Sequence, residues 1–179
     1  MEGRGKIILR PLTQIGSHIL EVLKQSLTQT FNCSVEIEAL TLSLKYACEP
    51  KREQYMASLL LSTLRNFCME PGDKCLGIVD VDLYSPGLNF IFGEADINSG
   101  VAIISLCRLR QERYGLPQDE RLLMDRTIKE AVHELGHTYH LSHCGDTKCV
   151  MHFSNSLADT DIKSASFCSK CQQRLEEVI

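Results

Sequence analysis

The sequence predicts an α/β fold with a mixed, twisted sheet, one long helix and a small C-terminal lobe. Strand-like and helix-like patterns alternate through the first two thirds of the chain, which is typical of α/β proteins. The composition then changes after residue 143. A chain of 179 residues with 44% apolar side chains can bury one core. We therefore expect a single domain over residues 1–179, with an N-terminal subdomain, 1–143, and a C-terminal subdomain, 144–179.

The first third of the chain alternates between strand and helix periodicity. The predicted elements are a strand over residues 6–10, a helix over 16–31, a strand over 35–40, a loop over 41–50 and a helix over 52–67. This order indicates a crossover unit with parallel strands. The helical spacing of the first helix is carried by Ile19, Leu20, Leu23 and Leu27.

The middle of the chain predicts three further strands and a long helix. Residues 75–82 form a short apolar run, as expected of a strand buried on both faces. Residues 89–95 form a shorter strand that contains Gly93, and a glycine in a strand often marks a bulge or a close approach. Residues 101–106 form the third strand. After Pro117, residues 119–139 are predicted to form the long helix, because their apolar residues form a core-facing stripe.

The long helix ends in a motif that predicts metal chemistry. His133 and His137 are four residues apart, so one helix face presents both imidazoles to a single ion. Glu134 projects beside that ion, where a carboxylate can take a proton from a metal-bound water. This is the HExxH pattern of zinc proteases.

A third ligand requires the chain to leave the helix. His143 is six residues after His137, about 240° around a continuing helix, and would point away from the metal. The HExxHxxGxxH signature of metzincins solves this with a glycine that takes a positive φ. In this chain His140 occupies that position. Either His140 adopts the positive φ itself, or the turn differs and His140 competes as a ligand, or the site binds zinc and turns over poorly; we favour the first.

From residue 133 onward the sequence resembles the archaemetzincins. The resemblance rests on the zinc helix, on the third histidine followed at once by a cysteine, on Cys149-Val150-Met151 and on Cys168-Ser169-Lys170-Cys171. It implies a zincin-like, metzincin-like catalytic domain. It also implies two zinc ions per chain, one catalytic and one structural. Residues 89–95 are then the candidate edge strand for an extended substrate.

By the same resemblance each site residue has an expected role. The catalytic zinc is held by His133, His137 and His143, Glu134 is the general base, and Met151 forms a hydrophobic floor called the Met-turn. The structural zinc is held by Cys144, Cys149, Cys168 and Cys171. Four thiolates suit a closed tetrahedral zinc site, whereas three histidines leave one position open for water. A cysteine site would also staple the polar tail, which cannot build a core of its own.

The sequence therefore predicts a zinc metallopeptidase that hydrolyses peptide bonds by a Glu-assisted, zinc-bound water and acts on peptides or unfolded proteins. The rival hypothesis is a zinc-binding, catalytically weak or inactive regulatory protein of the same fold. The net charge of −4 disfavours a nucleic-acid partner. We expect no membrane span and a cytoplasmic protein, because no signal-peptide core follows the first residues. The oligomeric state stays open, and the five other cysteines are expected to be buried: Cys33, Cys48, Cys68, Cys75 and Cys107.

Overall fold

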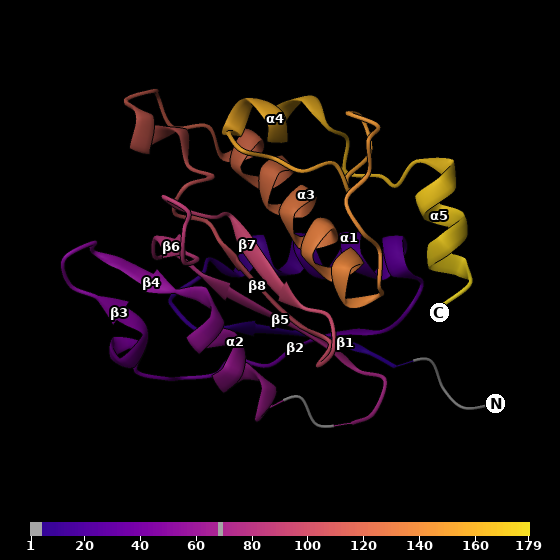
Figure 1. Ribbon diagram of the computed structural model, residues 1–179, viewed down its shortest axis with the longest axis horizontal. Coiled ribbons are helices and arrows are strands. Elements are labelled where there is room, and N and C mark those ends of the chain that lie inside the picture. The colour runs from indigo at the N-terminus through magenta and orange to yellow at the C-terminus, as the bar shows by residue number, and fades with distance from the viewer. Residues whose placement is uncertain (1–4, 68–69) are drawn as a thin grey trace.

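The computed structural model describes residues 5–67 and 70–179 and has a five-stranded mixed sheet at its centre (Figure 1). The strand order is β2-β1-β5-β8-β7. The first four strands run parallel, and β7 pairs antiparallel with β8 at one edge. The predicted fold class is confirmed. The strands are β1 (Ile7–Pro11), β2 (Val35–Ile37), β5 (Lys74–Val79), β7 (Gly93–Asp96) and β8 (Val101–Ser105).

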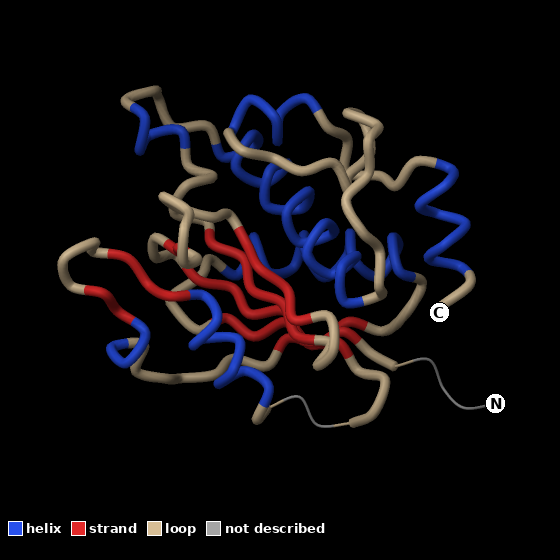
Figure 2. The backbone as a smooth tube through the Cα atoms, in the orientation of Figure 1, coloured by secondary structure: helices blue, strands red, loops and turns tan. Residues whose placement is uncertain are grey.

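Helices cover both faces of this sheet, as Figure 2 shows. Helices α1 (Ser17–Phe31) and α3 (Glu120–Thr138) pack on one face, and α2 (Ala57–Arg65) packs on the other. Every residue of β1 and β8 is buried, because a parallel strand in the middle of a sheet has helices above and below it. Burial on both faces explains why these strands appear in the sequence as continuous apolar runs.

The two helices on the α3 face are defined by caps and apolar stripes. Helix α1 ends at Asn32, which has a left-handed φ of 49°. Helix α3 begins after Asp119, whose carboxylate accepts a hydrogen bond from the Leu122 backbone N–H at 2.9 Å. The predicted helix over 119–139 is thus correct to within one residue at each end. The buried face of α1 comprises Ile19, Leu20, Leu23, Leu27 and Phe31.

The predicted helix over 52–67 is wrong in its first turn. Glu53 takes a positive φ of 53°, which reverses the chain between β3 (Cys48–Glu49) and β4 (Gln54–Met56). Helix α2 begins only at Ala57. Tyr55 fitted a helical stripe, but it pairs with β6 (Leu83–Tyr84) in a second sheet of order β3-β4-β6. The predicted loop over 41–50 also contains a short 3-10 helix, η1 (Lys45–Ala47).

Two predicted strand ranges also change. The strand predicted over 75–82 ends at Val79, and the strand predicted over 89–95 is displaced to β7. Residues 85–92 form a loop instead, and Ile91 makes an isolated antiparallel bridge to Leu83. A second 3-10 helix, η2 (Gln111–Tyr114), lies between β8 and α3.

The tail contains two helices that the sequence did not predict, α4 (Leu157–Ile162) and α5 (Ser169–Glu176). Ser156 and Asp159 form a reciprocal capping box that starts α4. The buried apolar residues of the tail join the core on the α3 face; they are Cys149, Val150, Met151, Cys171 and Leu175.

The scattered cysteines are less buried than expected. Cys75 is fully buried, while Cys33, Cys48 and Cys107 are partly buried. Cys68 lies outside the described residues. Among the described residues, no helix is long and apolar enough to cross a membrane.

Candidate metal centres and active site

The last two turns of α3 present two imidazoles to one point. His133 Nδ1 donates a hydrogen bond to the Val150 carbonyl at 2.8 Å, and His137 Nδ1 donates to the Leu141 carbonyl at 2.7 Å. A carbonyl only accepts, so Nδ1 carries the proton and Nε2 keeps its lone pair. The two Nε2 atoms lie 3.2 Å apart. Two nitrogens bound to one tetrahedral zinc at 2.0–2.1 Å are about 3.3 Å apart, so the pair fits a zinc ion.

His140 ends the helix in a left-handed conformation, with a φ of 63°. The His140 N–H donates to the His137 carbonyl at 2.9 Å, and the Leu141 N–H donates to the Gly136 carbonyl at 3.1 Å. This pair of bonds is a Schellman motif, which glycine usually completes. The favoured prediction for His140 is confirmed: it takes the positive φ itself. Its side chain is exposed.

The turn brings His143 to the other two histidines. Its ring centroid lies 5.3 Å from that of His133 and 4.8 Å from that of His137. The ligand atoms of these three histidines all lie within 4.8 Å of one another, and His140 is outside this group. His133 is buried, whereas His143 is exposed, so the group opens to solvent on one side. Three imidazoles and an open side are the donor set of a catalytic zinc site.

Burial also sets the protonation state that a metal requires. Desolvation lowers the pKa of His133 well below its usual value and lowers the pKa of His137 and His143 as well. All three imidazoles are therefore neutral at physiological pH, and metal binding need not displace a proton from them.

The Glu134 side chain projects from α3 toward the edge strand β7. Its carboxylate is buried, and desolvation, helped by the nearby charge of Glu130, raises its pKa well above the usual value. A Cβ at Gly93 would lie 2.7 Å from Glu134 Cγ and 2.7 Å from the Ile103 carbonyl oxygen. Gly93 thus marks a close approach, as predicted, and the Glu134 side chain fills the space.

A small cavity adjoins this carboxylate. Its volume is about 90 Å³, and its lining includes Glu134, His133 and Gly93. Loop residues 88–92 form one wall, and residues 153–155 form another. The cavity therefore joins the histidine group to the edge of the sheet.

Met151 packs against Gly136 of α3 and is fully buried. It follows Val150, whose carbonyl holds His133. A Cβ at Gly136 would lie 2.5 Å from Met151 Sδ, so only a glycine lets the methionine approach α3 this closely. Met151 therefore packs on α3 between the two histidines that this helix carries.

The four tail cysteines gather in a second group. The ligand atoms of Cys144, Cys149, Cys168 and Cys171 lie within 4.8 Å of one another. Cys144 Sγ and Cys168 Sγ are 3.8 Å apart, too far for a disulfide and equal to the separation of about 3.8 Å between two thiolates on one tetrahedral zinc. The Cys168 N–H donates to Cys149 Sγ at 3.3 Å, which favours a thiolate.

The thiols of this group differ in acidity. The Cys171 backbone N–H lowers the pKa of Cys168 to about 7, whereas burial raises the pKa of Cys149 and Cys171. Buried thiols give up their protons only when a cation is present to stabilise the thiolates. The four sulfur atoms are close enough to hold one metal ion, and such an ion would stabilise their thiolates.

Sequence reasoning missed a buried ion pair beside the histidines. Glu130 Oε1 lies 3.0 Å from Lys163 Nζ, and both side chains are at most 4% exposed. Glu130 is one helical turn before Glu134 and lines the same cavity, a relation that the four-residue spacing could have indicated. Lys163 comes from the tail, and no sequence pattern joins it to Glu130.

Comparison with known proteins identifies the family. The model of peptidase family M54 matches residues 17–177. An archaemetzincin of Pyrococcus abyssi is 45% identical over 97% of this chain and 95% of its own length. The crystal structure of the Methanopyrus kandleri archaemetzincin has a TM-score of 0.85 and 36% identity, covering 97% of this chain and 94% of that one.

A zinc-dependent peptidase from Methanocorpusculum labreanum has a TM-score of 0.87 and 29% identity, over 94% of this chain and 99% of that one. These matches extend well beyond the motif-bearing residues on which the sequence resemblance rested. The predicted enzyme class, a zinc metallopeptidase, is confirmed, and the chain belongs to peptidase family M54, the archaemetzincins.

Proposed function

We propose that the chain hydrolyses peptide bonds at a zinc ion held by His133, His137 and His143, with Glu134 as the general base. The observation that carries this proposal is the convergence of the two Nε2 lone pairs, 3.2 Å apart, beside a buried carboxylate. Lone pairs at this distance repel each other unless a cation lies between them. Family membership supports zinc as that cation.

Zinc at this position would acidify a water molecule and stabilise negative charge on the carbonyl oxygen of the substrate. The protein holds the histidine rings in the orientation that a metal ion requires. The carbonyls of Val150 and Leu141 hold His133 and His137 by Nδ1, so neither ring can rotate its Nε2 away. Met151, buried against Gly136 of α3, is proposed as the hydrophobic floor of the site, the Met-turn.

Glu134 is proposed to move the proton. Its raised pKa makes the carboxylate a better acceptor for the proton of the attacking water. The same oxygen can then deliver that proton to the nitrogen of the leaving amine. Glu130 and Lys163 lie behind it as a neutralised pair, which limits the charge repulsion between the two glutamates.

The proposed substrate is an extended peptide. Strand β7 lies at the edge of the sheet, next to the cavity that contains Glu134. An edge strand can pair with a peptide through backbone hydrogen bonds, which select an extended chain rather than a folded one. Short or unfolded peptides are therefore the expected substrates.

We also propose a second, structural zinc on the four cysteines, within a single catalytic domain of residues 1–179. In this proposal residues 144–179 form a C-terminal subdomain that the metal orders, on the N-terminal subdomain of 1–143. Cys144 directly follows His143, so the two metal groups share one segment. Structural zinc contributes on the order of 10 kcal/mol to folding, enough to order a short polar tail.

The test is peptide cleavage by Glu134→Gln protein, with zinc content measured in parallel. Cleavage should fall by at least about 10³-fold, because the base is lost, while zinc content stays unchanged. Glu120→Gln, in the first turn of the same helix, is the control and should cleave like the wild type. If the wild type binds zinc and cleaves nothing in a broad peptide library, a non-catalytic zinc-binding protein of this fold becomes the better account.

A further inference from the structure

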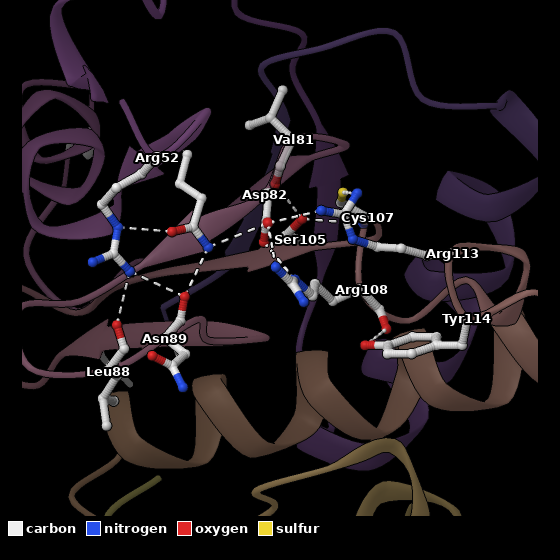
Figure 3. Close-up of polar contacts among 11 residues, drawn as sticks. Arg52, Val81, Asp82, Leu88, Asn89, Ser105, Cys107, Arg108, Arg113 and Tyr114 are labelled. Carbon is white, nitrogen blue, oxygen red and sulfur yellow. Dashed lines mark hydrogen bonds and ion pairs between the residues drawn. The ribbon is translucent and has the colours of Figure 1, made fainter. Parts of the chain in front are cut away.

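Asp82 lies at the centre of a network of polar side chains (Figure 3). Its carboxylate is buried, and it accepts hydrogen bonds from three side chains. Arg108 binds it through two nitrogens, at 2.8 and 2.6 Å, Arg113 donates at 3.0 Å, and Gln54 donates at 3.2 Å. A bidentate guanidinium is a directional partner, so the Asp82 carboxylate fixes the position of Arg108.

The same network reaches the loop that walls the cavity, residues 88–92, which we call the wall segment. The Gln54 side-chain amide donates to the Asn89 carbonyl at 2.8 Å. Arg52 Nη2 donates to the carbonyls of Leu88 and Asn89, at 2.9 and 3.1 Å, and Arg52 Nε donates to Gln54 Oε1 at 2.8 Å. Asp82, Gln54 and Arg52 thus form a chain of contacts that ends on the backbone of the wall segment.

A second route runs through Arg108. Its guanidinium carbon lies 4.4 Å from the centroid of the Phe90 ring, in a cation–π contact. Leu88, Phe90, Ile91 and Phe92 line the cavity that contains Glu134. Asp82 therefore acts on the wall segment from two sides, through backbone carbonyls on one and an aromatic ring on the other.

We propose that Asp82, Gln54, Arg52 and Arg108 are positioning residues that hold the wall segment in its substrate-binding conformation. The inference rests on the proposed function, since it assigns the wall segment to the peptide cleft. Backbone hydrogen bonds hold one end of the wall segment, from the Ile91 N–H to the Leu83 carbonyl and from the Ser105 N–H to the Phe92 carbonyl. At the other end, side-chain donors bind the carbonyls of Leu88 and Asn89. A wall that is already ordered spares the substrate the entropy of ordering it, which lowers KM.

A neighbouring ion pair offers a matched comparison. Asp80 is two residues before Asp82, and its carboxylate lies 2.9 Å from Arg110 Nη2. The described contacts of the Asp80 carboxylate are to Arg110, and none of them reaches the wall segment. Asp80→Asn removes the same charge from the same end of the sheet. Asp80→Asn protein therefore shows the effect of losing an ion pair alone, without any loss of contacts to the wall segment.

The experiment measures three quantities for Arg52→Ala, Asp82→Asn and Asp80→Asn proteins: amide hydrogen exchange of residues 88–92, KM and kcat for a peptide, and zinc content. Arg52 is exposed, so its replacement leaves the core intact. Arg52→Ala and Asp82→Asn should speed exchange in the wall segment and raise KM on the order of 10-fold, with kcat within about twofold. Zinc content should not change, and Asp80→Asn should match the wild type.

Arg52→Lys is a further test variant, because lysine keeps the charge but has one side-chain nitrogen. It cannot donate to Gln54 Oε1 and to the carbonyls of Leu88 and Asn89 from two separate nitrogens, as the planar guanidinium does. It should behave like Arg52→Ala. Unchanged KM and exchange in Arg52→Ala protein would overturn the inference, as would an equal rise of KM in Asp80→Asn protein. Failure of the proposed function would look different, because the wild type itself would then not cleave peptides.

Discussion

Gly136 and Met151 are packed so closely that a side chain at this helix position would displace the methionine: a Cβ at Gly136 would lie 2.5 Å from Met151 Sδ and 3.2 Å from Met151 Cε. Gly136 lies between His133 and His137, and Met151 follows the residue whose carbonyl orients His133. The glycine within the HExxH motif therefore lets Met151 contact the helix that carries the histidines.

Gly136→Ala should accordingly destabilise the protein. Displacing Met151 or shifting α3 costs about 1–3 kcal/mol, which lowers the midpoint of urea unfolding. Gly145→Ala is the control, because a Cβ there meets nothing within 4 Å. Equal midpoints for the two variants would show that the contact between Gly136 and Met151 is not tight.

His140→Gly should stabilise the protein by about 1 kcal/mol, because a non-glycine residue at positive φ is strained. Asn32→Gly is the matched control. Asn32 also ends a helix at positive φ, but asparagine tolerates that conformation better, so the gain should be smaller. Zinc content should stay unchanged in both variants. Loss of zinc in His140→Gly protein would mean that His140 is a ligand.

Gly93→Ala should reduce kcat while zinc stays bound. The added methyl group would lie 2.7 Å from Glu134 Cγ, so the carboxylate must move, and a displacement of about 1 Å can cost 10²-fold in rate. Gly77→Ala is the comparison, since its Cβ would lie 2.5 Å from Leu64 Cδ1 on the opposite face of the sheet. It should lower stability without a specific loss of kcat. A normal kcat in folded Gly93→Ala protein would contradict the assigned place of Glu134.

Cys149→Ser should remove one zinc per chain and expose residues 144–179 to proteolysis. Serine is a poor zinc ligand, and loss of the metal removes on the order of 10 kcal/mol of folding free energy from the tail. Cys107→Ser is the control, because Cys107 lies outside the four-cysteine group. Elemental analysis and limited proteolysis give the two readouts. An unchanged zinc content would argue against the cysteine site.

The sheet and α3 were predictable because their patterns are local. The runs that became β1, β5 and β8 are buried on both faces, and the stripe of α3 spans five turns. The conformation of His140 was also predictable, since His143 can join the other histidines only if the helix ends there. Because the three histidines lie close together, the turn between His137 and His143 can adopt few conformations.

The features that the sequence did not predict depend mostly on contacts between residues far apart in the chain. Tyr55 and Met56 fit a helical stripe, and only the turn at Glu53 shows that they belong to a strand. Asp82 looks like an ordinary residue at a strand end, and its role depends on Gln54 and Arg108 meeting there. The start of α4 did carry a local signal, the capping box of Ser156 and Asp159, which the cysteine pattern obscured.

The measurement that tests the central claim most directly is an anomalous-difference map collected at the zinc absorption edge. We predict two peaks per chain: one bound by His133, His137 and His143 with one position open, and one bound by Cys144, Cys149, Cys168 and Cys171. Ligand distances should be about 2.0–2.1 Å to nitrogen and about 2.3 Å to sulfur. A single peak, or a peak that includes the His140 ring in place of His143, would contradict the account.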